Sequence, residues 1–166
     1  MMHATDSTSI RQDIETRQDI AGLMRAFYGR AFENPVIGYI FTDVAHMDLE
    51  GHLPIMCDFW EKVLFQRGTY GRDAFTVHAR IHEVEPLTRQ HFQAWEDLWH
   101  ETVDDLFAGE KANLAKLHGS RMAGSIQRRL ANASDGNLIR IQSQVRRDVD
   151  GRGQDSAEAA CNAASQ

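Results

Sequence analysis

Apolar residues recur every three or four positions between residues 18 and 130, which is the spacing of one face of an α-helix. This spacing predicts helices over residues 18–32, 48–66, 74–81 and 110–130, and a further helix that begins after Thr88. No convincing alternation of apolar and polar residues predicts a strand. The pattern is typical of an all-α protein.

Residue types at the helix starts support these boundaries. Asn34 followed by Pro35 is typical of an N-cap and a first helical residue, and opens a short apolar turn. Thr88 is a good N-cap for the helix that follows it. Because proline has no amide hydrogen, Pro54 fits only within a first turn, so the helix over 48–66 is expected to begin irregularly or slightly later.

The distribution of aromatic residues predicts where the folded domain lies. All of them fall between residues 27 and 107, so the core is expected to be centred there. The rest of the chain is small, polar or rich in alternating charges. We expect a mobile N-terminus, one folded domain and a disordered or weakly helical tail, over 1–11, 12–133 and 134–166 respectively.

The composition argues against some classes of partner. The 166 residues include 18 Lys+Arg and 24 Asp+Glu, and the resulting net charge of −6 disfavours binding to nucleic acid or to an anionic membrane. No apolar run is long enough to span a membrane, and the N-terminus lacks the regions of a signal peptide, so we expect a cytoplasmic protein. Cys57 and Cys161 are then expected to be free thiols, with Cys57 a small buried residue.

The histidines have the most distinctive placement of the reactive residues. Five of the eight lie within the middle of the chain, at positions 46, 52, 78, 82 and 91. A haem needs a strong axial nitrogen, a flat apolar slot and a second wall with polar groups. His78 is the candidate axial ligand, with Phe75 on the preceding turn to pack against the ring. On spacing alone, a surface position is favoured for His78, as we expect for His46 and His100.

Several segments occur in the order and spacing of one family. They are Phe27-Tyr28, the stretch from Asn34 to Phe41, the stretch from His52 to Trp60, Tyr70 eight residues before His78, and the stretch from His91 to Phe107. Together they cover roughly residues 12 to 131 and resemble a group III truncated haemoglobin. The chain has no Gly-Gly pair, in agreement with the absence from this group of the paired-glycine motifs of other truncated globins.

The resemblance implies a truncated globin fold, a two-over-two helical sandwich around haem b (iron protoporphyrin IX). His78 is then the proximal iron ligand, and we expect its second ring nitrogen to donate to a backbone carbonyl near Ala74. The polar distal positions of the family match Tyr28, His52 and Trp95. The other residues expected in the haem pocket are Phe41, Met56, Phe59, Tyr70 and Phe75. His82 is expected near the haem edge or propionates, with a surface position as the alternative.

The chain departs from the family at two places. The stretch 70–74 reads Tyr-Gly-Arg-Asp-Ala where the family usually has proline last, so the proximal loop is expected to be looser. The last helix has His118-Gly119 where the family commonly has Arg-Ala. Glycine inside a helix costs about 1 kcal/mol relative to alanine.

The function implied is reversible binding of O2 and other diatomic ligands such as CO and NO. Two donors, Tyr28 and Trp95, predict slow O2 release, because each charge-assisted hydrogen bond contributes about 1.5 to 3 kcal/mol. Slow release favours ligand scavenging or detoxification of nitric oxide or peroxide, with a cellular reductase, over bulk transport. Whether the protein is an enzyme, a nitric oxide dioxygenase or a peroxidase, stays open, as does whether His52 faces the pocket, the iron or solvent.

Two other classes of protein remain as alternatives. One is a cofactor-free helical interaction module. The other is a non-haem metal-binding helical protein, although the repeated Glu-x-x-His pairs of di-iron bundles are missing from the sequence. The acidic composition and the absence of a spare apolar helix favour a monomer.

Overall fold

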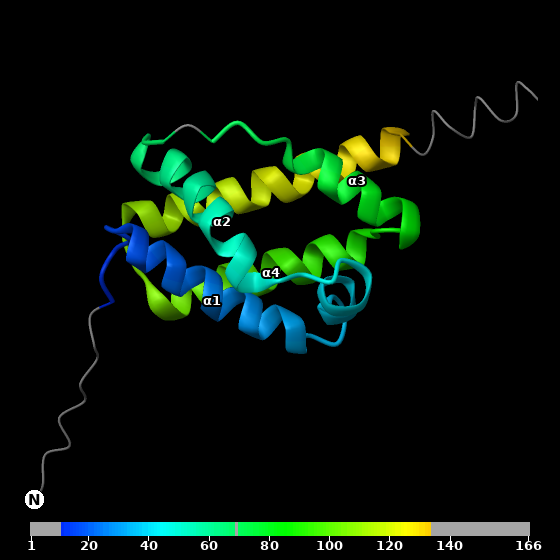
Figure 1. Cartoon of the computed structure of the whole chain (residues 1–166). Coiled ribbons are helices and arrows are strands. Elements are labelled where there is room, and N and C mark those ends of the chain that lie inside the picture. The colour runs from blue at the N-terminus through cyan, green and yellow to red at the C-terminus, as the bar shows by residue number, and fades with distance from the viewer. Residues whose placement is uncertain (1–10, 69, 134–166) are drawn as a thin grey trace, which may run out of the picture. The chain divides into compact units, whose positions relative to one another are not determined.

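The structure is a computed structural model that describes residues 11–68 and 70–133 (Figure 1). Backbone contacts divide the chain into two units, Met1–Gln127 and Arg128–Gln166. The first unit contains every helix labelled in Figure 1, and the described residues of the second are helical. The predicted tail, with Cys161, and almost all of the predicted N-terminal segment lie outside the described residues.

Helices make up the regular structure, and no strand occurs in the described ranges. The all-α prediction is therefore confirmed. The elements are α1 (Arg17–Glu33), the π-helical turn η1 (Ile40–Val44), α2 (Leu49–Phe65), α3 (Ala74–Val84) and α4 (Arg89–Leu106), followed by helical backbone over 110–133. Among the described helices, none is long and apolar enough to cross a membrane.

Helix α2 begins earlier than its proline predicts. It starts at Leu49, so Pro54 lies in the second turn and the expected late or irregular start was wrong. An internal proline costs about 3 kcal/mol, whereas burying a large apolar side chain contributes about 1.5 to 3 kcal/mol. The packing of α2 outweighs this cost because the helix buries Leu53, Met56, Cys57, Trp60 and Leu64.

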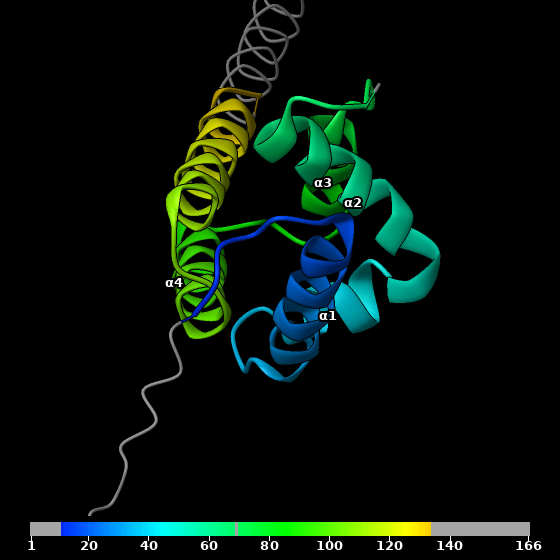
Figure 2. The same cartoon turned by 90° about the vertical axis from the view of Figure 1, so that its left-hand side faces the viewer.

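The helices of the first unit form two layers, which Figure 2 shows from the side. Helices α1 and α2 make one layer, and α4 with the helical stretch 110–127 makes the other. Helix α1 packs against both α2 and α4. This is the two-over-two arrangement that the resemblance implies. The core between the layers includes Ile20, Leu23, Phe27, Trp99 and Val103.

Trp99 lies at the centre of this core and is 1% exposed. Its indole stacks against those of Trp60 and Trp95, at centroid distances of 4.8 Å and 5.7 Å. Phe27 meets it edge-on at 5.3 Å, and the indole N–H donates to the Ala115 carbonyl at 3.1 Å. One side chain therefore joins α1, α2, α4 and the last helix.

The absence of a side chain at Gly119 makes room for the Trp99 indole. A Cβ at this buried position would lie 2.6 Å from Trp99 Cδ1 and closer still to Nε1. The indole has no free space to move into, because it is 1% exposed and stacks against both Trp60 and Trp95. The glycine that departs from the family pattern is therefore required by the packing of this chain.

A carboxylate near the start of the described chain caps the last helix. Asp13 Oδ2 accepts from the Lys111 N–H at 2.9 Å, and Oδ1 accepts from the Ala112 N–H at 2.8 Å. Burial raises the pKa of Asp13, but these N–H groups, that of Ile14 and the charge of Lys111 more than compensate and lower it below its ordinary value. Gly109 makes room for the cap, since a Cβ there would lie 2.6 Å from Asp13 Cβ. Asp13 thus satisfies N–H groups that have no partner within the helix.

We predict that Gly119→Ala lowers the free energy of unfolding by about 1 to 3 kcal/mol, because overpacking a tight core outweighs the gain in helix propensity. Gly22→Ala and Gly29→Ala in α1 are matched controls, since a Cβ at either position meets nothing within 4 Å. These two variants should be more stable by up to about 1 kcal/mol. Urea denaturation of the three variants measures the difference. Equal stabilisation by all three would show that Gly119 is not required by Trp99.

Candidate functional site

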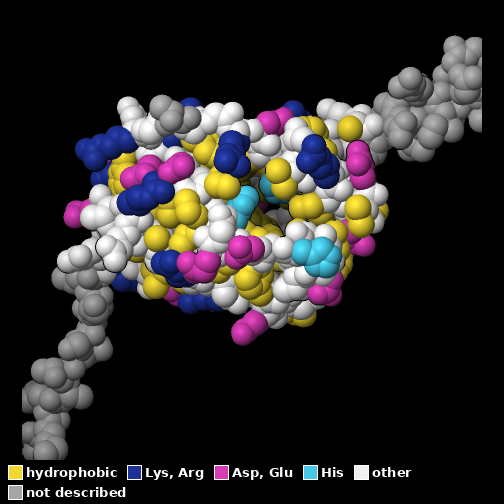
Figure 3. Space-filling model, in the orientation of Figure 1, with side chains coloured by type: hydrophobic (Ala, Val, Ile, Leu, Met, Phe, Trp, Pro, Cys, Tyr) yellow, Lys and Arg dark blue, Asp and Glu magenta, His cyan; other side chains and the backbone are white. Residues whose placement is uncertain are grey.

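Two cavities of about 140 Å³ and 120 Å³ lie within the first unit. Both are lined by the same four residues, Tyr28, His78, Trp95 and Met122. On the face drawn in Figure 3 the surface is hollowed, and hydrophobic and histidine side chains lie around the hollow. The sequence-predicted proximal ligand and two of the three predicted distal residues therefore come together, although they lie on three different helices.

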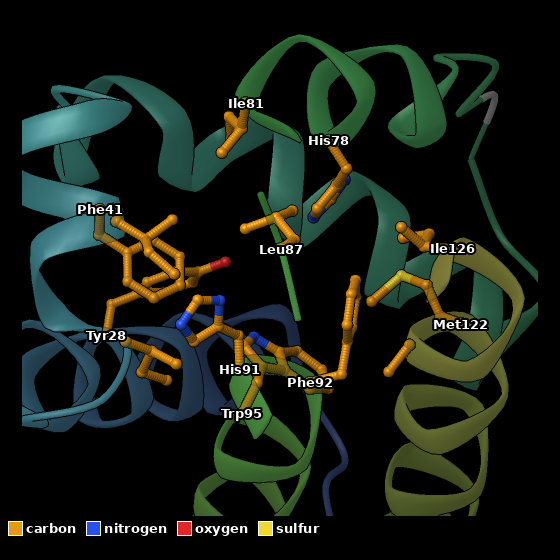
Figure 4. A pocket seen from close by; sticks show the side chains of 13 residues that line it. Tyr28, Phe41, His78, Ile81, Leu87, His91, Phe92, Trp95, Met122 and Ile126 are labelled. Atoms are coloured by element: carbon orange, nitrogen blue, oxygen red, sulfur yellow. The ribbon is translucent and has the colours of Figure 1, made fainter. Parts of the chain in front are cut away.

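The first cavity is largely apolar (Figure 4). Its polar groups are those of Tyr28, His78, His91 and Trp95. Its apolar walls come from the segment before and within η1, from α3 and the linker after it, from α4 and from the last helix. They are Ile37, Ile40, Phe41, Ile81, Leu87, Phe92, Met122, Ala123 and Ile126. Such a lining suits a flat apolar molecule with one or two polar contacts.

His78 points from α3 into the cavity. Its Nδ1 lies 2.7 Å from the carbonyl oxygen of Ala74, one turn earlier. A carbonyl can only accept, so Nδ1 carries the hydrogen and, in the neutral ring, Nε2 keeps its lone pair. The predicted hydrogen bond to a carbonyl near Ala74 is confirmed. It fixes the ring plane and leaves Nε2 able to bind a metal.

Tyr28 and Trp95 supply hydrogen-bond donors to the same space. The Tyr28 hydroxyl points into the cavity in Figure 4, and no described residue accepts a hydrogen bond from it or from the Trp95 indole N–H. Burial raises the pKa of Tyr28 to about 12, so the phenol keeps its hydrogen at physiological pH. Its ring is held by edge-on contacts to Phe27 at 5.0 Å and Phe41 at 5.6 Å.

Four more of the predicted pocket residues line the second cavity. Met56, Phe59 and Tyr70 form part of its wall, and the Phe59 and Tyr70 rings meet edge-on at 5.2 Å. His52 also lines this cavity but is exposed, which places it at the rim. The structure therefore places His52 where its side chain can reach either the cavity or solvent.

Two predicted residues are not among those that line either cavity. Phe75 lies on α3, one turn before His78, and is half-buried. The Nδ1 atom of His82 accepts from the Leu87 N–H at 2.9 Å, which ties the end of α3 to the linker that follows it. This bond is what the structure shows His82 to do, whereas a role for it near a haem edge stays a prediction.

Sequence reasoning assigned no role to His91, which lines the first cavity. Its Nδ1 accepts from the Thr88 N–H at 3.2 Å, as the third residue of a capping box does. Two signals in the sequence could have revealed it. A histidine three residues after an N-cap threonine can close the cap, and a residue four positions before Trp95 shares its helix face.

Three other residues were also given predictions that the structure tests. His46 is exposed, as expected. His100 is half-buried, and its Nε2 lies 2.9 Å from the Ser120 hydroxyl on the last helix, so the expectation of a solvent-facing side chain was wrong. Cys57 is a free thiol, 3% exposed, and burial raises its pKa, which confirms a buried and unreactive residue.

The arrangement can hold a metal ion only with help from another group. Within the described ranges, no three or more His, Cys, Asp or Glu side chains come close enough to bind a bare metal ion. His78 instead offers a single nitrogen above an apolar slot. A planar group that brings most of its own metal ligands fits this donor set.

Comparison with known proteins bears on the fold. A scan against protein-family models and a search of curated proteins find no match. Among solved structures, the group III truncated hemoglobin from Campylobacter jejuni matches with a TM-score of 0.63 and 22% sequence identity, over 73% of this chain and 95% of that one. At this identity the likeness establishes the fold alone. The chain has a truncated globin fold, as the resemblance in sequence implied.

We predict that Tyr28 makes the protein sensitive to alkali. Its pKa is raised from 10.0 to about 12, so the unfolded chain loses this proton at lower pH than the folded one. Stability from the protonated phenol is therefore present below pH 10 and is lost as the pH rises toward 12. Tyr28→Phe should unfold with a similar free energy at pH 8 but lose less of it at pH 11, as measured in urea. Identical losses in the two proteins would contradict the raised pKa.

Proposed function

We propose that this protein binds haem b and holds diatomic ligands at its iron. The proposal is carried by one observation: the lone pair of His78 Nε2 faces a slot whose other walls present two donors without an acceptor among the described residues, those of Tyr28 and Trp95. The chain shares its truncated globin fold with the group III truncated hemoglobin from C. jejuni, and this likeness supports the same function. When bound, the haem iron supplies reversible binding of O2, CO or NO.

Different residues of the chain would hold different parts of such a cofactor. His78 would bind the iron, and its bond to Ala74 would make the imidazole more basic and keep its ring in one orientation. Phe41, Ile81 and Leu87 would cover the apolar faces of the macrocycle and exclude water. His52, Met56 and Phe59 would form the distal wall, with His52 at the entrance.

Tyr28 and Trp95 would decide how long a ligand stays. Their hydrogens have no acceptor in the described part of the chain, so donating them to a polar ligand such as O2 breaks no existing bond. Two donors favour slow O2 release, and slow release suits scavenging or redox detoxification of nitric oxide or peroxide better than transport. We infer a cytoplasmic monomer that receives electrons from a reductase.

We predict that the reconstituted protein shows a strong Soret band that shifts on reduction and on addition of CO. His78→Gly should lose stable haem retention, because the slot then has no axial nitrogen. Added imidazole should restore the spectrum, since it can occupy the space of the deleted ring. Far-UV circular dichroism of the variant checks that its helices form. A wild-type chain that takes up no haem would favour the cofactor-free interaction module.

A second prediction concerns the distal donors. Tyr28→Phe and Trp95→Phe should each speed O2 dissociation by about tenfold or more, since one charge-assisted hydrogen bond contributes about 1.5 to 3 kcal/mol. Phe59→Leu is the matched control, because it alters the wall of the second cavity without removing a donor. Stopped-flow mixing of the oxygenated protein with CO measures the rates. Unchanged rates in both donor variants would disprove the distal assignment.

A further inference from the structure

Three elements that wall the first cavity meet at the hydroxyl of one tyrosine. Tyr39 directly precedes η1; its hydroxyl donates to Glu85 Oε1 at 3.0 Å and lies 3.5 Å from His91 Nε2. Glu85 is the C-cap of α3, and His91 lies in the first turn of α4. We call this contact the Tyr39 junction. It brings together the ends of three segments that are far apart in the sequence.

The partners of His91 determine which of its nitrogens carries the hydrogen. The Thr88 N–H donates to Nδ1, so in the neutral ring Nε2 is the protonated nitrogen. Nε2–H then faces the Tyr39 oxygen, and Tyr39 donates its own hydrogen to Glu85. The three hydrogen bonds therefore run in one direction, from Thr88 to His91, from His91 to Tyr39 and from Tyr39 to Glu85. Hydrogen bonds arranged in such a series strengthen one another.

Helix α3 depends on polar contacts more than its neighbours do. None of its residues is buried, whereas α1 and α2 each bury five apolar residues. Yet α3 carries His78 and Ile81, which line the first cavity. The bond between Tyr39 and Glu85 ties the C-terminal end of α3 to a residue 46 positions earlier in the chain. Because α3 buries none of its residues, this hydrogen bond at its C-terminal end helps to fix the orientation of the helix.

We propose that the Tyr39 junction positions α3, and with it His78, against the wall formed by η1 and α4. The inference rests on the proposed function, because it treats His78 as the iron ligand. Tyr39, Glu85 and His91 act as positioning residues and need not touch the cofactor. With the junction broken, the end of α3 moves more freely relative to Phe41 and Trp95, so the iron–histidine bond is held less firmly.

The test uses the haem-reconstituted full chain and two single-atom changes. Tyr39→Phe removes the hydroxyl, and Glu85→Gln removes the charge of its acceptor. Each should speed haem loss to an excess of a haem-scavenging apoprotein by about two- to tenfold, the range expected for one hydrogen bond. The double variant should lose haem no faster than the worse single variant, because both changes act on the same bond: Tyr39→Phe removes its donor and Glu85→Gln weakens its acceptor.

Two further variants separate positioning from general stability. Glu50→Gln removes a more exposed carboxylate, which lies on α2 and pairs with Arg25 on α1, and it should leave haem loss unchanged. His91→Gln keeps an acceptor for Thr88 and a donor for Tyr39, and should retain haem better than His91→Leu. Resonance Raman spectra of the ferrous proteins should show a shifted or broadened iron–histidine stretch in Tyr39→Phe and not in Glu50→Gln.

The outcomes distinguish this inference from the proposed function. If the wild-type chain binds no haem, the proposed function fails and the inference fails with it. If the wild type binds haem but Tyr39→Phe and Glu85→Gln retain it as firmly and show an unshifted stretch, only the junction is overturned. Additive effects of the two changes would also overturn it, since they would show that the residues act separately.

Discussion

The stacking of Trp99 against Trp60 and Trp95 is the contact on which the rest of the structure depends. Trp95 is both a partner in this stack and a wall of the two cavities. The two nearly parallel indoles differ in hydrogen bonding, because the Trp99 N–H donates to the Ala115 carbonyl, whereas no described residue accepts from the Trp95 N–H. The packing of the core therefore holds the orientation of a side chain that also lines the cavities.

The helices that carry the site residues differ in how well they are packed. Tyr28 and Trp95 lie on helices with well-buried faces, whereas His78 lies on a helix that buries no residue. The well-packed helices α1 and α4 thus carry the hydrogen-bond donors, whose positions would have to match a small ligand closely. Helix α3 carries the nitrogen that we propose as the metal ligand, and a cofactor in the slot would itself provide the packing surface that α3 otherwise lacks.

The sequence predicted most of the fold because its helices are long, periodic and marked at their starts. It also predicted the His78 bond to Ala74, since a residue one turn earlier is always within reach in a helix. Sequence could not predict that α2 tolerates Pro54, because the compensation comes from buried partners on other helices. Gly119 and His91 were missed for a related reason. Their roles depend on Trp99 and Tyr39, which meet them only after the chain has folded.

The cap on the last helix has a consequence for how the chain acquires its structure. Asp13 accepts from the backbone of Lys111, 98 positions further along the chain. A contact of such long sequence separation pays a large loop-closure cost, so it slows folding relative to local helix formation. During synthesis, Asp13 leaves the ribosome long before Lys111 and Ala112, so the cap can form only after almost the whole domain has been made. Helix α1 can form early, but the two-layer arrangement can close only when synthesis of the domain is nearly complete.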